Sequence, residues 1–144
     1  MKRRRETPSA GLVVRYDYLW RSEFLSKKIE GAKDRPCAVV VPMNVGDDGK
    51  HRVILAAITH SRPNASRAAI EIPIQAKIAI GLDNERSWII VDEVNIVDWA
   101  DAGFVPASSD AWAYGHLPRG FASKVIAAIV EGAKDGSLFR VTRD

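Results

Sequence analysis

Two short apolar runs, close together in the sequence, most constrain what this chain can fold into. Residues 36–41 read PCAVVV, and residues 53–58 read VILAAI. Runs of this length that are rich in β-branched residues are typical of buried strands rather than helices. The segment between them, residues 44–50, is rich in Gly, Asn and Asp, which favours a turn. We therefore predict two antiparallel strands joined by that turn.

Polar residues stand at one end of each run. Arg35 comes where the first run begins, and Thr59 comes where the second ends. Because antiparallel pairing puts the start of one strand beside the end of the next, we expect these two side chains to meet at one edge of the sheet. Their spacing alone also fits a plainer interpretation, in which a solvated arginine and a β-forming threonine simply end two strands.

The remaining segments predict a mainly β fold with one C-terminal helix. Residues 11–20 alternate, residues 87–99 form a long apolar strand, and residues 138–142 suggest a last short strand. Residues 21–33 and 100–115 are interpreted as a long mobile loop and an inserted loop. The apolar stripe of residues 118–134 predicts an amphipathic helix that begins at Pro118 and ends before Gly136. These elements suggest a small, twisted, barrel-like sheet with a helix packed against it.

Length and charge limit the class of protein. The chain has 144 residues, which suits one domain over residues 11–144, preceded by a basic disordered tail at residues 1–10 that could instead touch nucleic acid. A net charge of +3 and a pI of about 9.2 are compatible with a phosphate-bearing partner. No apolar run is long enough to cross a bilayer and no signal peptide is visible, so we expect no membrane association. The single cysteine, Cys37, fits a reducing cytoplasm and is expected to be buried and inert.

Several common kinds of site are not expected. The glycines at 46 and 49 have the wrong spacing for a phosphate-binding P-loop. Asp92 and Glu93 are adjacent on a predicted strand, so their side chains should point to opposite faces and should not form a carboxylate pair. The three histidines lack metal-ligand spacing, so we expect no metal and no cofactor.

The order of several short motifs resembles the MazF/PemK family of toxin endoribonucleases, over most of residues 11–98. No single motif is specific to this family, but the ordered set of motifs is moderately specific. The residues that carry the resemblance are Glu30, Arg35-Pro36, the run AVVV at 38–41, AAIT at 56–59, IEI at 70–72 and SWIIVDEVNIVD at 87–98.

The resemblance implies an SH3-like barrel, a homodimer, an antitoxin protein as partner and metal-independent cleavage of single-stranded RNA. By position, the catalytic residues of the family fall on Arg35, Thr59 and Glu30. Two residues depart from the family pattern, because Glu93 replaces a neutral residue and Asn95 replaces a base where RNA could lie. The segment at 100–115 is also longer than the family needs.

The residue types suit RNA cleavage without metal. A guanidinium at position 35 can stabilise the negative charge that builds on a phosphorane, and the Thr59 hydroxyl can donate a hydrogen bond to a phosphate oxygen. Either Glu30 or His60 could be the general base. The residues expected to contact RNA are Lys27, Lys28, Lys33, His60, Ser61, Arg62 and Arg67.

Aromatic residues leave two further questions open. The alternating Tyr16, Tyr18 and Trp20 could stack on bases or could pack in the core. Apolar surface at Trp88, Trp99 and Trp112 beyond what one helix covers would favour a homodimer. The alternative to an active toxin is a module of the same fold that binds RNA or a partner protein without cutting.

Overall fold

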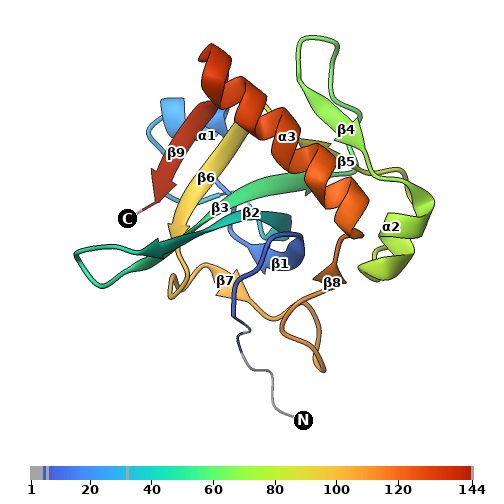
Figure 1. Cartoon of the computed structure of the whole chain (residues 1–144), viewed down its shortest axis with the longest axis horizontal. Coiled ribbons are helices and arrows are strands. Elements are labelled where there is room, and N and C mark those ends of the chain that lie inside the picture. The colour runs from blue at the N-terminus through green and yellow to red at the C-terminus, as the bar shows by residue number, and fades with distance from the viewer. Residues whose placement is uncertain (1–4, 6, 32, 144) are drawn as a thin grey trace.

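The computed structural model describes residue 5 and residues 7–31 and 33–143. Nine strands and three helices follow one another along this part of the chain (Figure 1). In chain order they are β1 (Leu12–Tyr16), α1 (Arg21–Leu25), β2 (Arg35–Val45), β3 (His51–Thr59), β4 (Ala69–Glu71), α2 (Ile74–Ala79), β5 (Trp88–Ile90), β6 (Glu93–Asp98), β7 (Phe104–Val105), β8 (Gly115–His116), α3 (Arg119–Asp135) and β9 (Phe139–Arg143).

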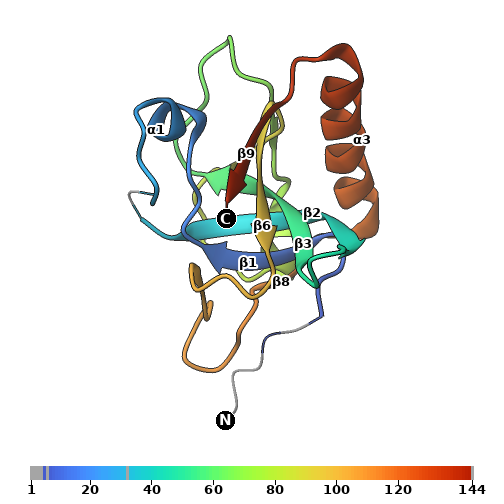
Figure 2. The ribbon, with the colours of Figure 1, turned by 90° about the vertical axis from the view of Figure 1, so that its left-hand side faces the viewer.

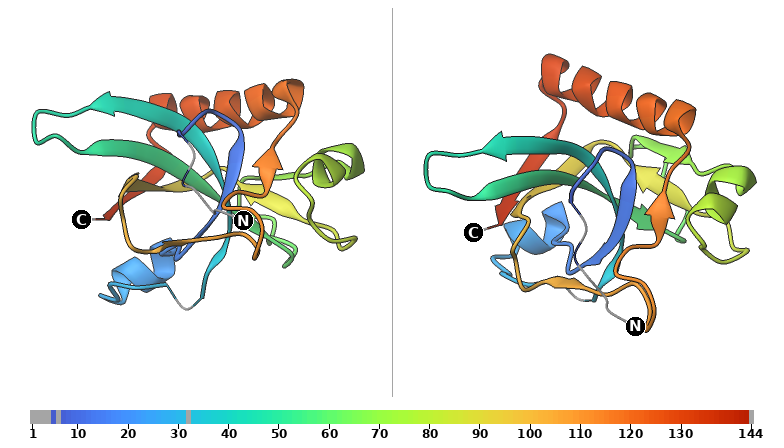
Figure 3. Two further views of the ribbon diagram at one scale, coloured as in Figure 1. Left: turned by 90° about the horizontal axis from the view of Figure 1, so that it is seen from below. Right: turned by 60° about the horizontal axis from the view of Figure 1, so that its bottom comes forward.

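The long β2–β3 hairpin is the centre of a single sheet that contains all nine strands. β1 pairs with the free edge of β2, and β5 and β6 pair with successive parts of β3. Every pairing is antiparallel except that of β6 with β9. No pairing among the described strands closes the sheet, which stays open. The predicted mainly β fold with a C-terminal helix is confirmed at this level, and the hairpin projects from the body in Figure 3.

α3 covers one face of this sheet, as Figure 2 shows from the side. Ala38 and Ala56 pack on that face in one cluster with Val125 and Ile129 of the helix. The helix begins one residue after Pro118 and ends at Asp135. It is capped by Gly136, whose φ of 81° lies in the left-handed region that glycine adopts without strain. The prediction of an amphipathic helix in this segment is confirmed.

The opposite face is covered by the segment between β6 and α3. Tyr16 and Tyr18 are fully buried there and pack with Trp99 and Trp112, which are 8% and 6% exposed. Because both faces of β2 and β3 are covered, their sequences are continuous apolar runs instead of alternating ones. The tyrosines are therefore core residues, and the argument for a homodimer from exposed tryptophans is wrong for Trp99 and Trp112.

The segments predicted as loops are more ordered than expected. Residues 21–33 contain α1, and the carbonyl of Ile29 accepts a hydrogen bond from Arg143 Nη2 at 3.1 Å. A Cβ at Gly31 would lie 2.2 Å from the carbonyl oxygen of Tyr18, so only glycine fits this close approach. Residues 100–115 supply β7 and the start of β8, which pair with β1.

The predicted long strand at 87–99 is interrupted. β5 ends at Ile90 and β6 begins at Glu93, and the two strands contact different parts of β3. The interruption changes the direction in which the side chains between the two strands and at the start of β6 point.

Half of the predicted basic tail, residues 1–4 and 6, lies outside the described residues. Arg5 is described, and its guanidinium donates to the carbonyl of Trp99 and lies 5.4 Å from the ring centres of Phe104 and Trp112. None of the described helices has the length and apolar character needed to cross a bilayer.

Candidate functional site

The two strand ends that the sequence singled out line one cleft of about 440 Å³. Cys37 pairs with Ala57, and continuing this register by two residues places Arg35 opposite Thr59 at the end of the hairpin. Trp20 closes one side of the cleft. The residues that line it are Trp20, Lys33, Asp34, Arg35, Pro36, Ile58, Thr59, His60, Ser61 and Leu82.

Arg35 is held in this cleft without a partner for part of its guanidinium. The guanidinium carbon lies 4.8 Å from the centre of the Trp20 ring, and Trp20 is itself buttressed by Tyr18 at 4.9 Å between ring centres. The Nε atom of Arg35 is buried and has no hydrogen-bond partner among the residues that the structure describes. A buried polar donor without a partner is unfavourable in a free protein. Arg35 as a whole is partly exposed and lines the cleft, so the accessible part of this permanent cation can meet an anion that enters.

Thr59 ends β3 at the same edge. Its Oγ1 accepts a hydrogen bond from the backbone N–H of Ser61 at 3.1 Å, which turns the chain out of the strand. Among the described residues, its hydroxyl proton has no acceptor. The Thr59 hydroxyl can therefore donate into the cleft.

His60 lies in the cleft because the strand has already ended, so strand alternation does not turn its side chain away. Its Nδ1 is 3.3 Å from the Arg86 carbonyl oxygen and 3.1 Å from Ser87 Oγ. Its Nε2 is 3.0 Å from Asp83 Oδ2. With both ring nitrogens engaged, His60 is poorly placed to take a proton from a substrate hydroxyl.

Asp83 and Glu85 approach His60 although they are far from it in sequence. The pairing of Ile58 with Ile89 and of Thr59 with Trp88 brings the loop before β5 to the end of β3. One donor atom from each of His60, Asp83 and Glu85 then lies within 4.8 Å of the others. The three histidines lack metal-ligand spacing in the sequence, but strand pairing brings two carboxylates to His60, a contact that linear spacing does not show.

The structure does not bring Glu30 to Arg35 and Thr59. Glu30 is exposed and lines an adjoining depression with Asp17 and Gly31, which shares Lys33 and Asp34 with the cleft. The carboxylate among the described lining residues of the cleft is instead Asp34, whose Oδ2 is 3.8 Å from Arg15 Nε. Sequence reasoning missed Asp34, although it directly precedes Arg35.

The predicted RNA contacts separate into three groups. Lys33 and Ser61 line the cleft with His60. Lys27, Lys28 and Arg62 are exposed but do not belong to its lining. The third group is Arg67 alone.

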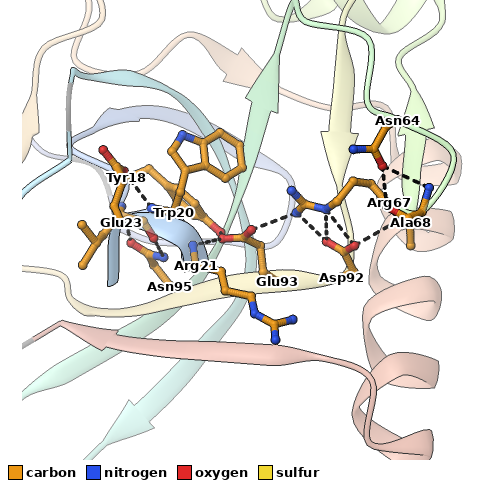
Figure 4. Close-up of polar contacts among 12 residues, drawn as sticks. Tyr18, Trp20, Arg21, Glu23, Asn64, Arg67, Ala68, Asp92, Glu93 and Asn95 are labelled. Carbon is orange, nitrogen blue, oxygen red and sulfur yellow. Dashed lines mark hydrogen bonds and ion pairs between the residues drawn. The ribbon is translucent and has the colours of Figure 1, made fainter. Parts of the chain in front are cut away.

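Arg67 is engaged by two carboxylates (Figure 4). Its Nε donates to Asp92 Oδ2 at 2.9 Å, and its Nη2 donates to Asp92 Oδ1 at 2.7 Å and to Glu93 Oε1 at 2.8 Å. The hydrogen bonds that Arg67 donates to Asp92 raise the pKa of Arg67 above its usual value. The prediction that Asp92 and Glu93 point to opposite faces is wrong, because the sheet is interrupted between β5 and β6. The geometry also leaves Arg67 little capacity to bind phosphate.

The two residues that depart from the family pattern, Glu93 and Asn95, are both buried. Glu93 is 2% exposed, and its Oε2 accepts hydrogen bonds from the Tyr18 hydroxyl at 3.2 Å and the Arg21 backbone N–H at 2.9 Å. Asn95 is fully buried and bonds both the N–H and the carbonyl of Leu19 at 2.9 Å. Neither side chain lies on a surface that RNA could reach, so the interpretation of both as changes to an RNA surface is wrong.

Comparison with known proteins adds no identification. No family model, no curated protein and no solved structure matches this chain. The resemblance to the MazF/PemK family therefore rests on the sequence motifs given above, and the function of the cleft has to be argued from its geometry.

Proposed function

We propose that this chain cleaves single-stranded RNA without a metal ion, as the toxin of a toxin–antitoxin pair. The observation that carries the proposal is Arg35, a partly exposed cation with no ion-pair partner among the described residues, in a cleft that also contains Thr59. An SH3-like arrangement of the sheet, a homodimer, an antitoxin protein as partner and a cytoplasmic location belong to the same proposal.

A phosphate group is the ligand that this cleft suits best. Arg35 has no ion-pair partner among the described residues, and Lys33 at the rim is exposed. A guanidinium is a planar fork of donors that matches two phosphate oxygens, and Trp20 fixes the plane of that fork. The positive charge is therefore oriented before the substrate arrives, which is the condition for strong electrostatic stabilisation of a transition state.

The chemistry follows from these donors. The RNA 2′-hydroxyl attacks the adjacent phosphorus, the bond to the 5′-oxygen breaks, and the products are a 2′,3′-cyclic phosphate and a free 5′-hydroxyl. Arg35 stabilises the charge on the non-bridging oxygens, and Thr59 donates a hydrogen bond to one of them. Asp34 replaces Glu30 as the candidate general base, because Asp34 lines the cleft and Glu30 lies outside it.

The test is cleavage of single-stranded RNA by the purified chain in excess EDTA. We expect Arg35→Ala to lose about two to three orders of magnitude in rate, the usual effect of removing one oxyanion donor. Arg35→Lys should restore little, because an ammonium does not reproduce the planar fork. Thr59→Val keeps the shape and removes the hydroxyl, so a large loss would identify the hydroxyl itself. Arg119→Ala is the matched control, since Arg119 is exposed at the start of α3 and does not line the cleft.

The outcomes separate the two classes of function. Circular dichroism must first show that each variant is folded. Cleavage that requires an added divalent ion, or an Arg35→Ala variant as active as the wild type, would make the mechanism wrong. If no RNA is cut when varied sequences are tested and the antitoxin is absent, the chain is better described as a module that binds RNA or a partner protein without cutting.

A further inference from the structure

Three side chains of different chemistry converge beside the cleft, at the rim formed by the end of β3 and the loop before β5. His60 Nε2 is 3.0 Å from Asp83 Oδ2 and 4.0 Å from Glu85 Oε2. The imidazole and both carboxylates are about half exposed or more, so a solvated ion can reach them. We propose that His60, Asp83 and Glu85 bind one divalent transition-metal ion of the Zn²⁺ type. His60 also lines the cleft, but the metal binding needs no RNA and the cleavage proposed above needs no metal.

The distances suit such an ion. Ligand atoms about 2.0–2.2 Å from zinc lie roughly 3.0–3.5 Å from one another in tetrahedral or octahedral arrangements. The separation of His60 from Asp83 is already in this range. Glu85 is 75% exposed, and a change of its side-chain rotamer can close the remaining gap.

The far side of the His60 ring is held as it is in protein metal sites. Nδ1 faces the Arg86 carbonyl oxygen at 3.3 Å and the hydroxyl of Ser87, a fully buried residue. A metal-bound histidine almost always has its second nitrogen fixed by such an outer partner, which orients the ring and selects the tautomer. On binding, a metal would displace the Nε2 proton that faces Asp83, and the Nδ1–H held by these partners would leave the Nε2 lone pair directed at the ion. This contact lies outside the three ligands and supports the site independently of their proximity.

The donor set selects the class of ion. One imidazole nitrogen with two carboxylate oxygens favours Zn²⁺ and similar transition metals, whereas Ca²⁺ and Mg²⁺ prefer oxygen ligands alone. Three protein ligands leave coordination positions for water.

Lys77 competes with the metal. Its Nζ is 3.2 Å from Asp83 Oδ1, and its side chain is only 4% exposed. The Glu85 backbone N–H also bonds Asp83 Oδ1, at 3.0 Å, so Oδ2 is the oxygen left for a metal. The ammonium neutralises part of the charge that would attract a cation, and removing it should therefore strengthen metal binding.

The experiment is calorimetric titration of the untagged, EDTA-treated and dialysed chain with ZnCl₂. We expect one Zn²⁺ per chain, and His60→Ala and Glu85→Gln should each weaken binding by at least about tenfold. His116→Ala is the matched control, because His116 is exposed and pairs with Ser9 Oγ instead, and it should bind as the wild type does. Lys77→Met should tighten binding about threefold, consistent with the loss of a half-exposed ion pair.

Several results would overturn the site. They are the absence of saturable binding at millimolar Zn²⁺, wild-type affinity in His60→Ala, or an equal loss in His116→Ala. Thermal unfolding of each metal-free variant checks that the fold is kept, and the exposed Glu85 makes Glu85→Gln the variant least able to disturb it. The experiment measures metal binding alone, so its result does not depend on whether the chain cleaves RNA.

Discussion

Arg35 and Arg67 lie in neighbouring parts of the molecule and have opposite surroundings. Arg67 donates to two carboxylates, one of them almost fully buried. Arg35 lies on Trp20, and its buried Nε has no partner among the described residues. A paired buried charge stabilises a structure, whereas an unpaired buried donor weakens the free protein. The exposed part of the Arg35 guanidinium lines the cleft and is available to a ligand. The comparison assigns Arg67 to the scaffold and Arg35 to the site.

One short segment connects the two arginines. Glu93, which binds Arg67, also accepts from the Tyr18 hydroxyl and the Arg21 N–H, and Asn95 bonds both backbone groups of Leu19. Residues 18–21 are therefore fixed against β6, and this segment carries the Trp20 ring on which Arg35 lies. We infer that the carboxylate cluster positions the cleft while taking no direct part in it.

The largest effect is expected from Arg67→Met. It leaves the buried Glu93 carboxylate without its cation, which typically reduces the free energy of unfolding by about 3–5 kcal/mol. Denaturant unfolding measures the change. Arg86→Met is the matched control, because the Arg86–Glu71 pair is largely exposed and should contribute less than about 1 kcal/mol. Equal losses in the two variants would contradict the structural role given to Arg67.

A smaller effect is expected at Trp20. Trp20→Leu removes the ring that orients the Arg35 guanidinium, and the cleavage rate should fall about tenfold, in line with the worth of a partly desolvated cation–π contact. Trp20→Phe keeps a ring in place and should recover most of that rate. If Phe and Leu behaved alike, the ring would not be positioning Arg35.

Acid should weaken the Arg67 cluster. Desolvation by burial raises the pKa of Asp92. The hydrogen bonds from Arg67 and the Ala68 N–H outweigh this effect and lower that pKa below its usual value. A depressed carboxyl pKa contributes stability above its unfolded pKa of about 3.9, and that contribution is lost as pH falls through the folded pKa. Asp92→Asn should therefore be less stable than the wild type at pH 7 and should approach it below about pH 4. A stability difference that stayed constant with pH would contradict this.

The sequence predicted those features that depend on local pattern. The paired strands and the helix follow from apolar periodicity, and Arg35 and Thr59 meet because antiparallel pairing brings strand ends together. The buried thiol of Cys37 was also predicted, and its burial raises its pKa.

Contacts made across the fold could not be read from the chain. The two-residue interruption between β5 and β6 turns Asp92 toward Arg67. A prediction of one continuous strand, with side chains alternating between the two faces, cannot show this contact. Likewise, the pairing of β3 with β5 brings His60 to Asp83, a contact that linear spacing does not reveal. The prediction that Glu30 joins Arg35 and Thr59 could not be checked from the chain either, because Glu30 lines the adjoining depression instead of the cleft.

The salt dependence of RNA binding also tests the assignment of Arg67 to the scaffold. With Arg67 committed to carboxylates, the remaining predicted cations, Lys27, Lys28, Lys33 and Arg62, should give a log–log slope of about −2 to −3 for single-stranded RNA. Lys33→Ala should reduce its magnitude by about 0.7, as loss of one phosphate contact does. Lys134→Ala, in the last turn of α3, should leave it unchanged. A flat dependence in the wild type would exclude phosphate as the main ligand.

The smallest change in stability is expected where the largest change in activity is proposed. Arg35→Met removes a cation–π contact worth about 0.5–1 kcal/mol, but it also removes a buried N–H that has no partner and keeps most of the apolar stem. These contributions oppose one another, so the free energy of unfolding should stay within about 1 kcal/mol of the wild type. Denaturant curves for Arg35→Met and Arg67→Met, recorded side by side, give the result directly. A loss at Arg35 as large as that at Arg67 would mean that Arg35 is also a scaffold residue. Stability that is unchanged or increased, with cleavage lost, would mean that the unpaired guanidinium is maintained for its ligand.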